Sequence, residues 1–448
     1  MPKPSSNEGD TFGSGWFALV PAYRLATFRV AIAVITIVFH VPKFNGLIEA
    51  YVASAFHVPP AFAWIPPLTP VGGLTLMVLQ PVAAGGLLLG VGQRLCGWFL
   101  AVAGFYVMAL DPEHYSHNAQ FHLTLLALVG CSSDRVSLAR LLRGSDAGAR
   151  CPAWPEHLVR LQLCIVLAYT ALDKVLSSSW GSSGALLAAL PLAPHGPGLA
   201  LVEHLNQAAV RAFPAALSLA TIGVEFFLAV AFLVRRLWPI GVVTGFVFAV
   251  YLEFLVRPGA FTWDMLAALL MFVPAGDRAW AVIHDPACPA CRWNRTILSS
   301  LDWLRRLRWI ELTPALASPA RSERVRWGLH LVSPRGREYP GFDALRVLPI
   351  VLPGPVFVGM AVVRFAGGFL AGRGYGRWDD LPFVMLAGLL ALWGPGVARW
   401  VGRPLYAAAV SAWGSGTRGS GRVASEADGT CPAHARPERA LHPPTRTV

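Results

Sequence analysis

The feature that most constrains the fold is a series of apolar segments between residues 25 and 276. Of the 448 residues only 14% are charged, whereas ordinary soluble proteins carry about 25%. A helix needs about 20 apolar residues to cross the hydrocarbon core of a bilayer. We therefore expect an α-helical polytopic membrane bundle of about 8 spans, surrounded by lipid. The expected spans are 25–41, 71–92, 95–111, 117–132, 157–176, 214–234, 237–256 and 260–276.

Composition and charge divide the chain into four parts. Residues 277–345 carry many more charges than the apolar region before them, and they alternate strand-like and helix-like patterns in the order β-α-β-β-β-α. That order predicts a C-terminal α/β domain of thioredoxin-like type. The apolar stretches 349–371 and 381–398 either pack on the membrane or add another hairpin of spans. The expected parts are a disordered or interfacial N-terminus (1–20), a transmembrane domain (21–276), the α/β domain with its apolar insertion (279–410) and a disordered tail (411–448).

The basic residues predict the orientation of the spans. Arginines cluster in alternate connections between the expected spans, as in cytoplasmic loops of membrane proteins: Arg94, Arg135, Arg140, Arg143, Arg150, Arg235 and Arg236. With the N-terminus in the cytoplasm, an even number of spans also places residue 277 onward there. The formal charge of +12 is explained by such flanks, so nucleic-acid binding is not expected. We expect an integral membrane protein of a bacterial-type plasma membrane.

Two cysteines stand close together just after the apolar region. The chain has 7 cysteines, and Cys288 and Cys291 form a Cys-Pro-Ala-Cys element between an apolar strand and a helix. The N-terminus of a helix favours a thiolate, and the second thiol can resolve a mixed disulfide. We expect Cys288 to attack, Cys291 to resolve, and Asp285 to assist proton transfer or position the turn. A zinc site would need a second ligand pair, for which the tail offers Cys431 and His434. An inert thiol pair is the third interpretation.

Ionisable residues inside spans are costly, so each is a functional candidate. By the expected topology, several lie near the extracytoplasmic face, where a desolvated lysine can act as a base. Interfacial snorkelling and packing remain the structural alternatives for them. The members of this group are His117, Asp173, Lys174, Glu253 and Asp264, with Glu225 expected deeper in the membrane and Tyr169 on the same span as Lys174.

Two stretches within the apolar region resemble a known membrane domain. They are Tyr169-Thr-Ala-Leu-Asp-Lys174 with Trp180-Gly, preceded by Arg160-Leu-Gln-Leu, and Tyr115-Ser-His117-Asn118. The pattern is similar to that of the HTTM (vitamin K-dependent γ-carboxylase-like) domain, over about residues 20–276. The resemblance implies that Lys174 is the base that deprotonates a vitamin K-like hydroquinone and that His117 assists it.

The charged C-terminal part resembles a second family, the DCC-type thiol-disulfide oxidoreductases. The matching elements are Asp285-Pro-Ala-Cys288-Pro-Ala-Cys291, the strand 307–312 and Gly341-Phe-Asp-Ala-Leu345. The resemblance covers about residues 279–410 and implies thiol-disulfide exchange, with a thioredoxin-like thiol partner.

Three functions remain open at this stage. The first is a membrane-bound thiol-disulfide oxidoreductase whose bundle binds a quinone or another small lipid-soluble substrate, with Tyr169, Asp173, Glu225, Glu253 and Asp264 as the substrate-binding group. The second is a carboxylase- or epoxidase-like enzyme that uses Lys174 and His117. The third is a scaffold or transporter in which Glu225, Glu253 and Asp264 line a path. Apart from the quinone no cofactor is expected, and no metal.

Overall fold

The computed structural model describes most of the chain up to residue 370. The described ranges are 15–53, 64–110, 117–132, 136–143, 149–181, 208–255, 259–275, 279–286, 288–312 and 329–370. Several expectations therefore lie outside the described residues. These are the disordered segment 1–14, the stretch before His117, the apolar segment 381–398, the end of the α/β domain at residue 410 and the tail 411–448.

The described chain begins with a strand, where the sequence suggested a disordered or interfacial segment. Strand β1 (Leu19–Pro21) pairs antiparallel with β2 (Arg150–Pro152), and Val20 lies opposite Cys151. This pairing ties the N-terminal segment to the start of α7 (Trp154–Leu176), because β2 ends directly before that helix. The difference arises because strand partners distant in sequence leave no local signal.

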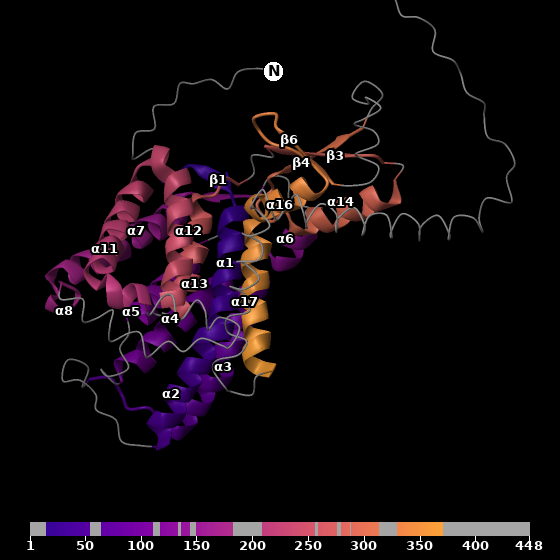
Figure 1. Ribbon diagram of the computed structural model, residues 1–448. Coiled ribbons are helices and arrows are strands. Elements are labelled where there is room, and N and C mark those ends of the chain that lie inside the picture. The colour runs from indigo at the N-terminus through magenta and orange to yellow at the C-terminus, as the bar shows by residue number, and fades with distance from the viewer. Residues whose placement is uncertain are drawn as a thin grey trace, which may run out of the picture. The chain divides into compact units, whose positions relative to one another are not determined.

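The first membrane segment is longer than hydropathy predicts. Helix α1 (Tyr23–Ile35), the π-helix η1 (Thr36–His40) and α2 (Val41–Ala53) follow one another without a break. The predicted span ended at residue 41, because Lys43, Asn45 and Glu49 lower the hydropathy beyond it while the helix continues. Almost all of α1 is buried, so it forms the centre of the bundle (Figure 1).

A buried arginine on α1 makes hydrogen bonds to the C-terminal end of helix α3. Helix α3 (Pro70–Leu89) ends at Gly90, which has φ +79°. Arg29 is fully buried and donates hydrogen bonds to the carbonyl oxygens of Leu87, Leu88 (3.3 Å) and Val136 (2.5 Å). A Cβ atom at residue 90 would lie 3.1 Å from the Arg29 guanidinium, so glycine meets both the backbone and the packing requirement there.

Two glycines bring the next two helices into close contact. Helices α4 (Gln93–Ala109) and α5 (His117–Cys131) pack where Gly97 faces Gly130. A Cβ atom on Gly97 would lie 2.8 Å from the Gly130 backbone. Small residues of this kind let helix backbones approach closely in membrane proteins.

The remaining bundle helices are α7, α11 (Pro214–Leu233), α12 (Trp238–Leu255) and α13 (Ala260–Leu269). A short 3-10 turn, η7 (Leu270–Phe272), extends α13. Helix α11 packs along α7, and α13 packs against α1 and α5. Each of the eight segments predicted as spans coincides with a helix.

Within the part of the chain that the structure describes, fewer than eight helices are long and apolar enough to cross a membrane. Within the described ranges four are long and apolar enough: Tyr23–Ala53, Pro70–Leu89, Pro214–Leu233 and Arg235–Glu253. Two further apolar helices, Gln93–Ala109 and Ala260–Phe272, are shorter. Helix α5 has only 15 residues, and α7 carries several charged side chains. A count of eight spans therefore stays a prediction.

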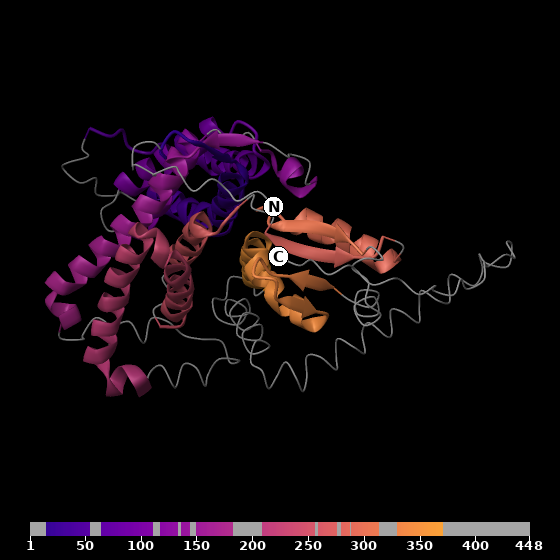
Figure 2. The ribbon, with the colours of Figure 1, turned by 90° about the horizontal axis from the view of Figure 1, so that it is seen from above.

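The C-terminal part contains one four-stranded sheet. Its strands are β3 (Trp280–His284), β4 (Leu307–Glu311), β5 (His330–Val332) and β6 (Glu338–Pro340), in the order β4-β3-β5-β6. Strand β3 is parallel to β4 and antiparallel to β5. Helix α14 (Pro289–Leu301) connects β3 to β4, and α16 (Phe342–Val351) follows β6. Figure 2 shows the four strands with both helices.

The apolar stretch after the sheet begins with a sharply bent helix pair. Helices α16 and α17 (Pro353–Leu370) meet at 86° around residue 352. Phe357 on α17 contacts the buried ring of Trp263 edge-on, with centroids 5.7 Å apart. Helix α17 therefore packs on α1 and α13. If the bent pair is one broken span, the number of candidate spans in the described part rises to five.

Candidate functional sites

The thiol pair lies where the sheet meets helix α14. Cys288 is the N-cap residue of α14, and its N–H donates to the Asp285 carbonyl oxygen at 3.2 Å. Cys288 is half-buried, whereas Cys291, in the first turn of the helix, is buried. Burial raises the pKa of the Cys291 thiol to about 11, and its hydrogen bond with Cys288 acts in the same direction. The two thiols are thus adjacent but differ in accessibility.

Two basic side chains near this pair, His284 and Arg295, were not singled out from the sequence. His284 ends β3 and is buried, and its Nε2 lies 3.1 Å from Nη1 of Arg295. Arg295 lies four residues beyond Cys291 on α14, hence on the same face of the helix, and stacks over Trp309 at 5.9 Å. The sequence signal that could have identified Arg295 is its position four residues after Cys291, which places both on one face of the helix.

A second candidate site pairs α7 with α11. Nζ of Lys174 donates to both carboxylate oxygens of Glu225, at 2.7 and 2.8 Å, and lies 3.5 Å from the Thr170 carbonyl oxygen. The side chains of Lys174 and Glu225 are 14% and 5% exposed. The ring of Trp180 lies 5.0 Å from Nζ, which adds a cation–π contact. The sequence analysis expected Glu225 deeper in the membrane than Lys174. The packing of α7 against α11 brings its carboxylate within reach of the long lysine side chain.

The other residues predicted near Lys174 occupy different positions. Tyr169 is 54% exposed, and its ring lies 6.1 Å from that of exposed His117. Asp173 is exposed, and its side chain points about 100° away from that of Lys174 around the helix axis. Glu253 is buried on α12. The predicted polar group is thus divided between several places.

Asp264 belongs to a separate cluster. It is fully buried on α13, and its Oδ1 lies 2.7 Å from Nδ1 of His122 on α5. The ring of His122 stacks on that of His40, with centroids 3.6 Å apart. His40 and His122 were not among the predicted site residues. Both are ionisable residues inside apolar segments, so the criterion that selected Asp264 could have found them.

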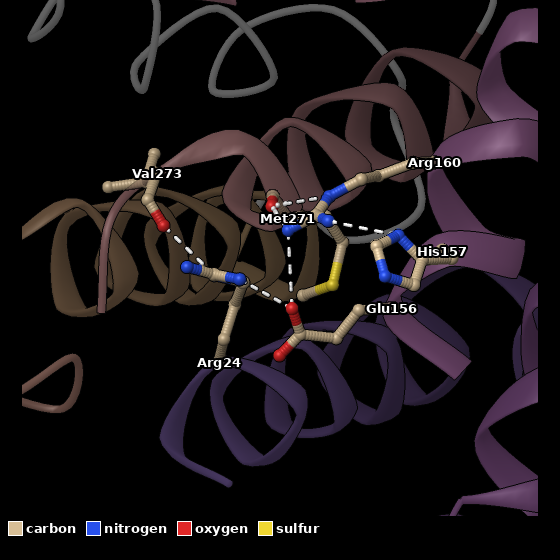
Figure 3. A network of polar contacts seen from close by, with 6 residues as sticks. All are labelled: Arg24, Glu156, His157, Arg160, Met271 and Val273. Carbon is tan, nitrogen blue, oxygen red and sulfur yellow. Dashed lines mark hydrogen bonds and ion pairs between the residues drawn. The ribbon is translucent and has the colours of Figure 1, made fainter. Parts of the chain in front are cut away.

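A fourth polar cluster joins α1, α7 and η7. Arg160 donates to the Met271 carbonyl oxygen from Nε (2.9 Å) and Nη2 (2.7 Å), and to Glu156 at 3.2 Å. Arg24 donates to the same Glu156 carboxylate and to the Val273 carbonyl oxygen (2.9 Å), as Figure 3 shows. The two arginines donate hydrogen bonds to the backbone carbonyl groups of Met271 and Val273, which have no partner within the helix because η7 ends there. Arg160 therefore has a structural role at this position.

The apolar helices and the polar clusters buried between them indicate an integral membrane protein with a helical bundle. Comparison with protein families identifies the bundle: the HTTM domain matches residues 17–276. The chain therefore belongs to the HTTM domain family, which is related to the vitamin K-dependent carboxylases. Comparison with curated proteins and with solved structures finds no match. The matched range ends before the thiol pair, so the resemblance of residues 279–410 to DCC-type proteins stays a prediction.

Proposed function

We propose that the protein is a membrane-bound thiol-disulfide oxidoreductase in which Cys288 attacks and Cys291 resolves. The observation that carries this proposal is the difference between two adjacent thiols at the start of α14. Cys288 is half-buried at the N-cap, and Cys291 is buried one turn further on. The order β4-β3-β5-β6, with the thiols between β3 and α14, further supports a thioredoxin-like domain.

The chemistry follows from this asymmetry. The Cys288 thiolate attacks one sulfur of a partner disulfide, and the other partner sulfur leaves as a thiolate. Cys291 then loses its proton and attacks the Cys288 sulfur, which releases the second partner thiol and leaves a Cys288–Cys291 disulfide. Two electrons pass from the protein to its partner. Because burial raises the pKa of Cys291 to about 11, this thiol stays protonated until the mixed disulfide has formed.

Asp285 has one contribution in this scheme. Its backbone carbonyl oxygen accepts the N–H of Cys288, so it fixes the turn before the helix. We assign Asp285 as a positioning residue.

The experiment is disulfide trapping with the full-length protein in detergent. The Cys291→Ser variant should accumulate a covalent adduct with a small aromatic disulfide or with oxidised thioredoxin, because the resolving thiol is missing. The Cys288→Ser variant should form none. Cys164→Ser is the control, since Cys164 is a buried cysteine on α7. Equal adduct formation by Cys288→Ser and Cys291→Ser would contradict the assignment.

Zinc binding has less support than redox chemistry for these cysteines. Structural zinc sites have four ligands. Among the described residues, the one cluster of three or more metal-ligating side chains lies elsewhere. Cys431 and His434, the remaining candidates from the sequence, lie outside the described ranges.

The second candidate function concerns the bundle itself, and one observation favours it. The Lys174–Glu225 pair is held between α7 and α11 beside Trp180, within the part of the chain that matches the HTTM family. We propose that a quinone or another small lipid-soluble substrate binds beside it. Glu225 takes the ammonium proton of Lys174 across their hydrogen bond, and the neutral Lys174 amine then acts as the base, with His117 assisting. Lys174→Met should abolish substrate conversion and leave thiol exchange by Cys288 intact. Loss of both activities together would argue against two separate sites.

The transporter hypothesis has less support from the contacts. Glu225 pairs with Lys174, and Asp264 pairs with His122. Two of the three carboxylates proposed to line a path therefore have partners in different clusters.

A further inference from the structure

Three bundle helices bring together side chains with metal-binding donor atoms. His40 ends the π-helix η1, His122 lies on α5, and Asp264 lies on α13. Each is at most 2% exposed. Nε2 of His40 lies 3.8 Å from Oδ2 of Asp264, and Nδ1 of His122 lies 2.7 Å from Oδ1 of the same carboxylate. The three residues are 82 to 224 positions apart in the sequence, so only the fold assembles them.

The hydrogen bonds inside this cluster are incomplete. His122 contacts Asp264 through Nδ1 and the Thr36 hydroxyl through Nε2, at 3.1 Å. In contrast, Nε2 of His40 and Oδ2 of Asp264 are buried and face each other at 3.8 Å, which is too long for a normal hydrogen bond, and Nδ1 of His40 is buried with no hydrogen-bond partner within 3.5 Å. Buried polar groups normally have hydrogen-bond partners, because an unpaired group has lost its bonds to water without replacement. The polar atoms of His40 and Asp264 thus point to a missing partner.

The backbone beside the cluster is also unusual. Thr36–His40 is a π-helix within an otherwise regular helical run. Such π-bulges within α-helices frequently occur at functional sites. This turn carries two of the groups concerned, His40 and Thr36, so the irregular backbone and the unpaired donors occur at the same place.

The donor set suits a transition metal. Two imidazoles and one carboxylate are the protein ligands of catalytic zinc sites and of non-haem iron sites, which keep further coordination positions open. The candidate donor atoms all lie within 4.8 Å of one another. Metal–ligand bonds of about 2.0–2.2 Å hold ligand atoms roughly 3–4 Å apart. Small side-chain movements would therefore bring all three onto one ion.

From these observations we infer that His40, His122 and Asp264 hold a divalent first-row transition metal, either Zn²⁺ or Fe²⁺, inside the membrane domain. Asp264 supplies the negative charge that offsets the buried cation. Thr36 orients the imidazole of His122 from the opposite ring nitrogen, as an outer-shell partner does in metal sites. The site is separate from the Lys174–Glu225 pair and from the two thiols.

The experiment measures metal directly and does not depend on an enzymatic activity. The full-length protein is purified in detergent without chelator, and its metal content is measured by mass spectrometry. The protein stripped with chelator is then titrated with Co²⁺, whose visible absorption reports its ligands. A Cys288→Ser/Cys291→Ser background removes the paired thiols from the measurement, and any thiolate from the remaining five cysteines would show as sulfur ligation in the Co²⁺ spectrum. We expect about one metal per chain and a Co²⁺ spectrum typical of nitrogen and oxygen ligands.

Variants identify the residues. Asp264→Asn keeps the shape of the side chain, and His40→Gln retains a polar group; each should lower the metal content at least tenfold in protein that remains monodisperse. His157→Gln is the control, because His157 is a bundle histidine in the network of Figure 3 and outside the cluster. A background protein that binds no Zn²⁺, Fe²⁺ or Co²⁺ would overturn the inference, as would Asp264→Asn protein with the metal content of the control. Should the variants aggregate, the Co²⁺ spectrum of the background protein decides alone.

Discussion

The thiol pair on α14 and the Lys174–Glu225 pair both join a more accessible group to a more buried one, but they are built differently. Cys288 and Cys291 lie in one helical turn, so their geometry is fixed by local sequence. Lys174 and Glu225 are 51 residues apart on two helices and meet only because α7 packs on α11. We therefore expect changes to the first pair to alter chemistry with little effect on folding. Changes to the second should alter stability as well.

The largest expected effect is the loss of thiol exchange in Cys288→Ser. The half-buried thiol at the N-cap is the nucleophile of the proposed scheme, so reduction of a small disulfide should fall to the background rate. The melting temperature should stay close to that of the wild type, because the change is small and partly exposed. If the Cys288→Ser protein retained thiol exchange, another cysteine would be the nucleophile.

Removing one member of the second pair should destabilise the bundle. Glu225→Ala leaves the Lys174 ammonium in a largely buried position without its partner, which costs about 3–5 kcal/mol. The double variant Lys174→Met/Glu225→Leu should recover most of that loss, because an apolar pair of similar volume can replace a buried ion pair. Thermal unfolding in detergent measures both. If the single and double variants have the same melting temperature, the ion pair does not stabilise the contact between α7 and α11.

The pH dependence of alkylation sharpens the contrast between the two thiols. In Cys288→Ser protein, Cys291 should still react slowly with iodoacetamide at neutral pH, because burial raises the pKa of its thiol. Only the thiolate reacts, so the rate should rise about tenfold per pH unit and level off above pH 9. A rate that levels off near pH 9 would show that Cys291 is not buried as described.

The smallest effect is expected at the neighbour of Lys174. Asp173 is exposed, so Asp173→Asn should change stability by no more than about 0.5 kcal/mol and leave substrate conversion unaltered. It serves as the matched control for Glu225→Ala, since both remove one carboxylate near the same lysine. An effect comparable to that of Glu225→Ala would mean that Asp173 shares the ion pair.

What could be predicted from the sequence differs between these regions for a physical reason. Apolar runs mark helices, and the eight predicted segments are all helical. Strand and turn signals likewise placed β3, α14 and β4 around Cys288, because these patterns are local. Hydropathy missed the continuation of the first helix to Ala53, since polar residues there do not stop a helix.

The candidate site in the bundle was only partly predictable. Lys174 and Asp264 stood out as ionisable residues in apolar segments, but their partners did not follow from the sequence. The pairing of Lys174 with Glu225 and of Asp264 with His122 depends on helix packing, and one sequence carries no direct record of which helices touch. The π-helix at Thr36–His40 has no sequence signature that we recognised, and with it His40 was overlooked.

The most direct test of the central claim is a redox titration of the full-length protein. The protein would be equilibrated at fixed ratios of reduced to oxidised glutathione and then labelled with a maleimide reagent that adds mass to each thiol. The account predicts that two labels disappear together as the buffer becomes more oxidising, through a disulfide that forms between Cys288 and Cys291 and is absent from Cys288→Ser protein. Retention of both labels under every condition, with Cys288 accessible, would contradict a thiol-disulfide oxidoreductase.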